Sequence, residues 1–393
     1  MGIKIVDGFI FYNELDMLDM RLKEHNDVVD YFILVEANQT FTGRYKPLYF
    51  SDNVERFKPY LHKIIHIVVD DMPMTNDPWV REIYQRNCIS RGFEILDEND
   101  IIIISDLDEI LNIYTLRGIL NMNLDGVYSL EQDMFYYNFE CIDQNKWILP
   151  KVFTYRYYMD NNPDLHVLRN TSDPNKTIKS GGWHCSYFGD ISFIRNKVQN
   201  FSHQEFNSDI YLDDENIKKQ ITECGDLFRR TDAHQFKKQY IFENKYLPIN
   251  YRMMLQSSEL KLYYGTTGAY NDVTNKYIGL FKVIDDILFI PNNLNIFLEI
   301  DNNLVVIYKK DYIIISKDVS KELNVTYGNV DMTSKFIELY CSINNMCISD
   351  NIKYNEIIGY DPMPDIVKTL TIRINGYKYI VNEYNKNKMV ISV

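Results

Sequence analysis

Over the first 110 residues, apolar positions alternate between the spacing of strands and the spacing of helices. Leu15, Leu18 and Leu22 recur at helical spacing, and Asp77 with Pro78 has the composition of a helix start. These patterns predict helices over 14–25 and 77–96, and continuous apolar runs predict buried strands over 3–13, 28–37, 62–70 and 100–109. The alternation is typical of an α/β fold with a mostly parallel central sheet covered on both faces.

After residue 126 the predicted strands become longer and richer in aromatic residues. They cover residues 126–140, 147–158 and 178–189. Two segments with helical spacing follow, over 191–201 and 212–228, and residues 230–258 are expected to form a closing helix and linker.

From about residue 260 short predicted strands alternate with turns that contain Asn and Gly. The segment "YYGTTGAYNDVTNKYIGLF" (263–281) returns as "TYGNVDMTSKFIELY" (326–340), and "LNIFLEIDN" (294–302) has a weaker echo in "VKTLTIRIN" (367–375). We therefore expect a first domain over 1–245, a linker over 246–260, and two repeated β-modules over 261–320 and 321–393.

The composition narrows the classes of function. The 393 residues carry a net charge of −13, which argues against a general nucleic-acid-binding protein, because phosphate contacts need clustered Lys and Arg. The six cysteines form no C-x-x-C pair, so a zinc ribbon is not expected, and five of them have the apolar neighbours of reduced core residues. The start of the chain lacks the pattern of a signal peptide and no apolar run is long enough to span a bilayer, so we expect a cytoplasmic protein in a reducing compartment.

Acidic residues lie at the end of the fourth predicted strand, in "IIIISDLDEI" (101–110). Side chains two residues apart on an extended segment point the same way, so Asp106 and Asp108 can face one divalent cation, such as Mn²⁺ or Mg²⁺. In a parallel α/β sheet ligands bind at the carboxyl ends of strands, where these acids lie. The alternative is an ordinary strand end kept soluble by charge.

A second candidate ligand lies in "GGWHCSYF" (181–188). His184 there could bind the same cation, and an imidazole suits Mn²⁺ better than Mg²⁺. The alternative is a core histidine held by hydrogen bonds.

Further polar residues are expected around a bound nucleotide. On the predicted helix 77–96, Arg81, Gln85 and Arg86 could contact phosphate, or could form a solvated charged face. Asn13 in "FYNE" and Glu36 in "VEANQTFTGR" lie at the ends of the first two strands, where base and ribose bind in such sheets. No P-loop, G-x-G-x-x-G or G-x-S-x-G pattern is present, which argues against P-loop kinases, dinucleotide-dependent oxidoreductases and α/β-hydrolases.

Five of these segments, taken in order, resemble glycosyltransferase family 17. They are "YNELDMLDMRL", "FILVEANQTFTGRYKPLYF", "WVREIYQRN", "DIIIISDLDEI" and "GGWHCSYF", and the resemblance covers roughly residues 1–245. It implies a GT-A type nucleotide-sugar-binding fold, an inverting mechanism, UDP-N-acetylglucosamine as donor and a glycan or glycoprotein as acceptor. Animal members carry an N-terminal transmembrane helix, a pattern that this sequence lacks.

The resemblance and the residue chemistry together predict roles in the site. Asp108 and His184 would hold Mn²⁺ on the donor diphosphate, while Asp106 contacts the ribose or a metal-bound water. An inverting transfer needs a general base, for which Glu205 in "FSHQEFN" is preferred, with Glu131 and Asp133 as alternatives.

The sequence leaves two other classes of function open. A non-catalytic carbohydrate-binding or structural protein could retain the fold with a degenerate transferase domain. A nucleotidyltransferase also uses paired acids and a metal, but the Gly- and Lys-rich phosphate loop expected near its first strand is missing.

Overall fold

The computed structural model divides the chain into two compact units, Met1–Met254 and Leu255–Val393. In the first unit the structure describes residues 2–230, 234–244 and 246–254, and in the second it describes residue 255 and the strands with a few flanking residues. The described ranges of the second unit are 258–266, 269–273, 281–284, 287–290, 303–309, 311–317, 324–327, 330–331, 341–342, 345–348, 369–374, 377–382 and 389–392.

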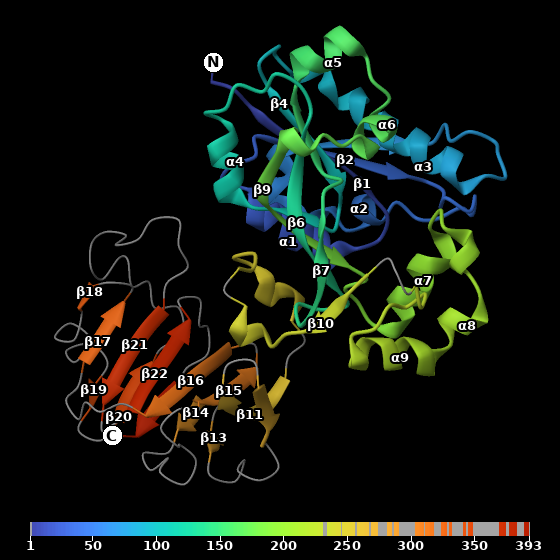
Figure 1. Ribbon diagram of the computed structural model, residues 1–393. Coiled ribbons are helices and arrows are strands. Elements are labelled where there is room, and N and C mark those ends of the chain that lie inside the picture. The colour runs from blue at the N-terminus through green and yellow to red at the C-terminus, as the bar shows by residue number, and fades with distance from the viewer. Residues whose placement is uncertain are drawn as a thin grey trace. The chain divides into compact units, whose positions relative to one another are not determined.

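A ten-stranded mixed sheet forms the centre of the first unit (Figure 1). Its parallel part has the order β3-β2-β1-β4, and the antiparallel strands β8, β6, β7 and β10 continue it beyond β4. Off this path β9 pairs with β6 in parallel and with the short β5 in antiparallel orientation. The strands are β1 (Ile5–Phe11), β2 (Tyr31–Ala37), β3 (Ile64–Val69), β4 (Ile101–Asp106), β5 (Glu109–Leu111), β6 (Tyr128–Tyr136), β7 (Cys141–Trp147), β8 (Lys151–Thr154), β9 (Thr177–Ser186) and β10 (Phe236–Lys238).

Helices pack against this sheet and around its antiparallel end. The α-helices α7, α8 and α9 lie together near β7 and β10, at the right of Figure 1. The helices are α1 (Leu15–His25), α2 (Tyr49–Asp52), α3 (Pro78–Asn87), α4 (Ile113–Ile119), α5 (Tyr155–Asn161), α6 (Leu165–Asn170), α7 (Ile191–Asn200), α8 (Asp209–Leu212) and α9 (Asp214–Glu223), with 3₁₀ helices η1 (Val54–Lys63), η2 (Cys88–Ile95), η3 (Pro174–Lys176), η4 (Gln204–Phe206), η5 (Ile241–Glu243) and η6 (Tyr251–Met254). The longest described α-helix, α1, has 11 residues, so no helix in the described part of the chain could span a bilayer.

Three predicted elements differ from the structure. The helix expected over 77–96 is α-helical only to Asn87 and continues as the 3₁₀ helix η2. The strand expected over 147–158 is wrong beyond Thr154, whose side chain accepts a hydrogen bond from the backbone N–H of Tyr157 and so begins helix α5. The closing helix expected after residue 230 is also wrong, because the described residues there form β10 and two short 3₁₀ helices.

Arg21 on α1 is fully buried beneath the turn that joins β4 to β5. Its guanidinium donates to both carboxylate oxygens of Asp7, at 2.6 and 2.9 Å, and to the Ser105 hydroxyl. It also donates to the backbone carbonyl oxygens of Asp106, Leu107 and Glu109, at 2.8 to 3.0 Å. One buried charge pair therefore fixes the backbone of the D-x-D segment from the core side.

His25, one turn further along α1, bonds the same aspartate. Its Nε2 accepts a hydrogen bond from the backbone N–H of Leu111 at 2.9 Å, so its Nδ1 donates to Asp7 at 3.1 Å. Burial raises the pKa of Asp7, but Arg21 and His25 outweigh it and lower that pKa to about 2.

A disulfide joins Cys141 on β7 to Cys224 at the end of α9, with a Cα–Cα distance of 5.3 Å. The expectation of reduced core cysteines is therefore wrong for this pair, which sequence spacing could not identify because 83 residues separate the two. Cys88 and Cys185 are free and buried.

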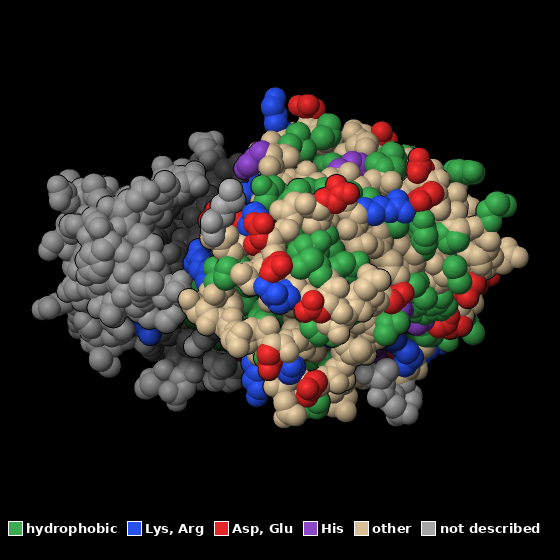
Figure 2. Space-filling view, turned by 90° about the horizontal axis from the view of Figure 1, so that it is seen from above, with side chains coloured by type: hydrophobic (Ala, Val, Ile, Leu, Met, Phe, Trp, Pro, Cys, Tyr) green, Lys and Arg blue, Asp and Glu red, His purple; other side chains and the backbone are tan. Residues whose placement is uncertain are grey.

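On the face of the first unit that Figure 2 shows, acidic and basic side chains are interspersed.

In the second unit the described elements are strands of two sheets. An eight-stranded sheet has the order β12-β11-β15-β16-β22-β21-β17-β18, and a five-stranded sheet has the order β13-β14-β23-β20-β19. The strands are β11 (Ser258–Thr266), β12 (Ala269–Asp272), β13 (Lys282–Ile284), β14 (Ile287–Ile290), β15 (Asn303–Lys309), β16 (Asp311–Lys317), β17 (Asn324–Tyr327), β18 (Val330–Asp331), β19 (Cys341–Ser342), β20 (Asn345–Ile348), β21 (Thr369–Ile374), β22 (Tyr377–Asn382) and β23 (Met389–Ser392).

The repeat seen in the sequence corresponds to two hairpins at opposite ends of the larger sheet. The hairpin β11–β12 carries the first Tyr-Gly pair, and β17–β18 lies at the second. The expected modules 261–320 and 321–393 each contribute strands to both sheets, and β16 pairs with β22 across their boundary. They are thus halves of one unit, while the segment 294–302 of the weaker echo lies outside the described residues.

The boundary between the units lies after Met254, inside the expected linker 246–260. The carboxylate of Glu24 accepts hydrogen bonds from the backbone N–H groups of Ile249 and Asn250, at 2.7 and 2.8 Å. The indole of Trp183 donates to the Tyr246 carbonyl at 3.1 Å. The first unit therefore includes this closing segment.

Replacing Asp7 with Asn should lower the free energy of unfolding of the first unit by about 3–5 kcal/mol, because Arg21 would keep its charge in the core without a counter-charge. All three tryptophans lie in this unit, so denaturation followed by tryptophan fluorescence measures it alone. The exposed Asp160→Asn is the control and should change stability by less than about 0.5 kcal/mol. Equal stability of the two variants would contradict the role of the buried pair.

The same pair predicts a pH dependence. Because the folded-state pKa of Asp7 is lowered to about 2, its stabilisation is complete above the unfolded value of about 3.9 and is lost as the pH falls toward 2. The loss should amount to about 2 to 3 kcal/mol, and stability measured against pH should show it in the parent protein but not in Asp7→Asn.

A fragment ending at Met254 should fold on its own, since the closing segment bonds only within the first unit in the contacts described above. A fragment ending at residue 240 should be clearly less stable, because Glu24 and Trp183 lose their partners. Thermal unfolding followed by tryptophan fluorescence would compare them, and two equal midpoints would place the boundary elsewhere.

Candidate active site

A cavity of about 400 Å³ lies at the carboxyl ends of the parallel strands. Strand ends supply Tyr12, Asp106 and Asp108, and β9 supplies His184 and Ser186. The charged residues of the lining are the acids Glu14, Glu82, Asp106 and Asp108 and the bases Lys46, Arg86, Arg169, Lys197 and Arg230. The lining of an acidic protein is therefore slightly basic, which suits an anionic ligand.

Asp106 is held between two guanidinium groups. Arg86 from α3 donates to Oδ1 and Arg169 from α6 donates to Oδ2, both at 2.6 Å. Although burial raises the pKa of Asp106, Arg169 and Arg86 lower it to about 2. With both oxygens paired, Asp106 is placed to anchor the two arginines rather than to bind a cation directly.

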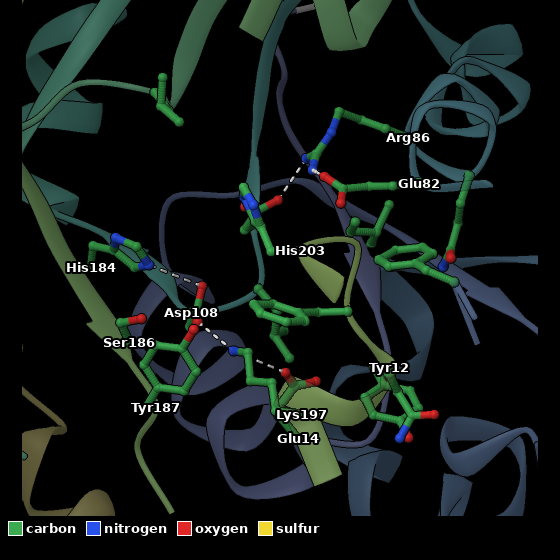
Figure 3. Close-up of a pocket in the computed structure, with 18 of the residues that line it drawn as sticks. Tyr12, Glu14, Glu82, Arg86, Asp108, His184, Ser186, Tyr187, Lys197 and His203 are labelled. Carbon is green, nitrogen blue, oxygen red and sulfur yellow. Dashed lines mark hydrogen bonds and ion pairs between the residues drawn. The ribbon is translucent and has the colours of Figure 1, made fainter. Parts of the chain in front are cut away.

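Asp108 faces a different set of groups (Figure 3). Its Oδ1 lies 3.5 Å from Nε2 of His184, and its Oδ2 accepts a hydrogen bond from Nζ of Lys197 at 2.8 Å. Nζ of Lys197 also lies 3.3 Å from the carboxylate of Glu14. Burial raises the pKa of Asp108, but Lys197 and His184 outweigh it and hold that pKa well below its usual range.

Strand pairing explains why His184 reaches Asp108. Glu109 and His184 are directly opposite each other in the antiparallel pair β5–β9, and the backbone N–H of Cys185 donates to the carbonyl of Asp108 at 2.7 Å. The His184 ring also packs on Trp147, with 4.5 Å between ring centroids. The local fold thus brings together two residues that are 76 positions apart in the sequence.

Glu109 is a buried structural residue in this site. Its carboxylate accepts hydrogen bonds from the backbone N–H of Asp106 at 2.7 Å, from the indole of Trp147 and from Arg169. Burial raises its pKa, and Arg169 acts in the opposite direction. Arg169 therefore bridges Glu109 and Asp106.

Asp108 and His184 fit a divalent cation as a pair of ligands. Two ligands at roughly 2.1 Å from one ion lie at most about 4.2 Å apart, and the separation of 3.5 Å falls within that limit. Nδ1 of His184 is buried and has no hydrogen-bond partner in the described part of the chain. Among the described residues, however, no group of three or more His, Cys, Asp or Glu residues forms a metal site, so the remaining ligands would have to come from water and substrate.

Helix α7 and the segment after it form the opposite wall. Lys197 and Asn200 come from α7, and His203 and Phe206 from the turns that follow. Phe228 stacks on Phe206, with 4.1 Å between ring centroids, and Arg230 lies over both rings. This wall combines cations with aromatic faces, a combination suited to sugars and phosphates.

The structure brings together some of the predicted site residues. Gln85, Arg86, Asp106, Asp108 and His184 line the cavity. Six other residues, which were predicted to contact the nucleotide or to act as general base, do not line the cavity. They are Asn13, Glu36, Arg81, Glu131, Asp133 and Glu205.

Four of these side chains bond to other parts of the protein. Glu36 is fully buried and accepts from the backbone N–H of Phe50, while Arg81 donates to the carbonyls of Phe41 and Thr75. Asp133 pairs with Lys146, and Glu205 accepts from His203 at 2.7 Å.

Sequence reasoning missed five residues that line the cavity, namely Lys46, Arg169, Lys197, His203 and Arg230. They lie on segments remote from the D-x-D, and the sequence contains 42 Lys and Arg residues among which nothing local distinguishes them. In the motif "FSHQEFN", His203 lines the cavity and Glu205 does not.

The model of glycosyltransferase family 17 matches residues 2–248, which is nearly the whole of the first unit. The chain belongs to this family. The second unit lies beyond the match.

Curated relatives match a shorter segment. Over 115 residues the chain is 30% identical to the β-1,4-mannosyl-glycoprotein 4-β-N-acetylglucosaminyltransferases of Rattus norvegicus and Homo sapiens. The match covers 27% of this chain and 21% and 22% of those proteins, so the chain spans about a fifth of the length of the relatives it matches.

Solved structures give weaker likenesses. HddC from Yersinia pseudotuberculosis is 12% identical with a TM-score of 0.27, covering 47% of this chain and 91% of that chain. An active-site mutant of LgtC is 10% identical with a TM-score of 0.26, covering 45% of this chain and 72% of that chain.

Replacing Arg169 with Met should destabilise the site, because Glu109 and Asp106 would face each other without the cation between them. We expect a loss of about 3–5 kcal/mol in the free energy of unfolding of the first unit, measured by urea denaturation. Arg156→Met is the matched control, since Arg156 pairs with Glu98 at the surface and should contribute less than about 1 kcal/mol. A smaller effect at Arg169 than at Arg156 would contradict the bridging role.

Proposed function

We propose that this protein is a metal-dependent, inverting glycosyltransferase that moves a sugar, N-acetylglucosamine from UDP-N-acetylglucosamine, to a hydroxyl group of a glycan or glycoprotein. The observation that carries the proposal is the pairing of Asp108 with His184 and Lys197 in the cavity of a family 17 domain. The names of the curated relatives support the donor sugar and a mannosyl acceptor.

The donor diphosphate would bind where the cations converge. Mn²⁺, held by Asp108 and His184, would supply Lewis-acid stabilisation of the leaving diphosphate. Lys197 bonds the other oxygen of Asp108, so it can stay in place beside the ion and contact a phosphate oxygen. Arg86 and Arg169 are oriented by Asp106 and add positive charge on the side of α3 and α6.

The nucleoside would lie toward β1 and β2. Tyr12, Thr40 and Phe41 line that part of the cavity, and Nζ of Lys46 lies 5.6 Å from the ring centroid of Tyr12. An aromatic face can stack on a base, and hydroxyl groups can bond ribose. The sugar and the acceptor would then face the wall formed by α7 and the segment after it.

The second unit is proposed to bind glycans or a partner protein, which leaves transfer to the first unit. Fragment 1–254 should therefore bind UDP with Mn²⁺ about as tightly as the whole chain.

A screen of UDP- and GDP-sugars for Mn²⁺-dependent release of nucleotide, with 4-nitrophenyl hexosides as acceptors, tests the proposal. We expect UDP-N-acetylglucosamine to be the preferred donor. Asp108→Asn should lower turnover at least about 100-fold and weaken UDP binding in calorimetry with Mn²⁺, because a metal ligand becomes a neutral amide.

The matched control is Asp125→Asn, an exposed acid outside the cavity, which should behave like the parent protein. A parent protein that binds glycans but shows no metal-dependent nucleotide binding would instead be the non-catalytic carbohydrate-binding protein.

A further inference from the structure

The proposed transfer needs a group that accepts a proton. The acceptor hydroxyl forms a bond to C1 of the donor sugar and must lose its hydrogen. The carboxylates that line the cavity are poorly suited, because each is already paired with a cation. Glu14 and Asp108 share Lys197, Glu82 bonds Arg86, and Asp106 lies between Arg86 and Arg169.

Four histidines line the cavity, namely His166, His184, His203 and His234. His184 lies against Asp108 and is the proposed cation ligand. His234 bonds the buried Asp143 at 2.6 Å, but its ring stacks on Phe236 and only 11% of its side chain is exposed. For His166 the described contact is a ring contact with Trp79, and no carboxylate bonds its ring.

His203 combines an oriented ring with access to the cavity. Its Nδ1 lies 2.7 Å from a carboxylate oxygen of Glu205, and 47% of its side chain is exposed. Its ring packs edge-on against Trp79, with 4.6 Å between ring centroids. No described residue hydrogen-bonds its Nε2, so that nitrogen is available to a substrate.

The contact with Glu205 sets the tautomer of the ring. Although burial raises the pKa of Glu205, the hydrogen bond from His203 holds it below its usual value, so Glu205 is a carboxylate at neutral pH. A carboxylate must accept from Nδ1–H, which leaves the lone pair on Nε2. This is the arrangement in which an imidazole acts as a general base.

Other contacts fix His203 relative to the proposed donor site. The hydroxyl of Ser202 donates to Glu82 at 2.6 Å, and Glu82 pairs with Arg86, which bonds Asp106. Figure 3 shows His203 in the same cavity as Arg86, Glu82 and Asp108. The base therefore sits on a turn connected by hydrogen bonds to the D-x-D.

We propose that His203 is the general base of the transfer and that Glu205 is the residue that positions it, an assignment that rests on the proposed function. The hydroxyl proton of the acceptor passes to Nε2 of His203 while the hydroxyl oxygen forms its bond to C1. The bond from C1 to the diphosphate oxygen breaks, and its electron pair leaves with UDP. His203 then releases the proton to solvent, to which its side chain is open.

His203→Asn tests the base, because its amide can still donate to Glu205 but has no basic nitrogen. With the donor and 4-nitrophenyl hexoside chosen by the screen above, kcat/KM should fall by about 100- to 10,000-fold. The acid limb of the kcat/KM–pH profile should disappear, while UDP affinity with Mn²⁺, measured by calorimetry, should stay within about twofold.

Glu205→Gln tests the positioning role. It should lower kcat/KM less, roughly tenfold, and move the acid limb to lower pH, because a neutral amide no longer stabilises the protonated ring. This variant leaves unchanged the other charged or titratable groups on the elements packed around His203. These groups are Glu82 and Arg86 on α3, His166 on α6, and Arg230. If Glu205 had a purely structural role, its replacement would leave the acid limb of the kcat/KM–pH profile at the same pH.

Two exposed residues outside the cavity provide matched controls. His62→Asn and Glu223→Gln should leave the rate and the pH profile unchanged. If His203→Asn keeps its rate and its acid limb, or if only His234→Asn loses them, the assignment of His203 is overturned. A parent protein that neither binds UDP with Mn²⁺ nor releases it would overturn the proposed function itself, and the base assignment with it.

Discussion

The buried pair of Arg21 and Asp7 is the interaction on which the site depends. Arg21 has no exposed surface, and it donates to three backbone carbonyls of the segment 106–109. A turn rich in acids would otherwise carry unpaired carbonyl dipoles into the core beside its own negative side chains. The pair leaves the carboxylates of Asp106 and Asp108 on the cavity side, because Arg21 bonds only the backbone there. The position of both acids therefore follows from a residue on the first helix.

A second layer of cations faces the same acids from the cavity. Arg86 and Arg169 pair with Asp106, and Lys197 pairs with Asp108, so neither carboxylate depends on a metal ion for its counter-charge. The two acids nevertheless differ in what they leave open. Asp106 has both oxygens occupied, whereas Oδ1 of Asp108 faces only His184. Spacing on an extended segment predicts that the two acids point the same way, but it cannot predict that their neighbours divide the roles between them.

The sequence could predict those parts of the molecule whose signal is local. Apolar runs such as 101–104 predicted the parallel strands, and the two aspartates of the D-x-D line the cavity at the end of β4. The prediction that the strand continues over 155–158 was wrong. The tyrosines there suit a strand, but the Thr154 side chain caps the first turn of a helix, and the segment is helical. Arg169 and Lys197 were not predictable, since each reaches the site only through tertiary packing from a helix remote in sequence. The disulfide was missed for the same reason, because its cysteines meet only once β7 and α9 are in place.

The wall that carries Lys197 and His203 is held separately from the parallel sheet. Cys141 and Cys224 tie β7 to the end of α9, and Ile194, Val198 and Ile217 pack in a core cluster of their own around this link. The parallel sheet presents Asp106 and Asp108 from another cluster, built on β1 to β4. The cavity is therefore formed between two cores, and polar contacts cross from one to the other. Two hydrogen bonds cross this boundary, from Lys197 to Asp108 and from Ser202 to Glu82. The first joins two residues that are proposed to act in the transfer, so these residues also help to align the two walls of the cavity.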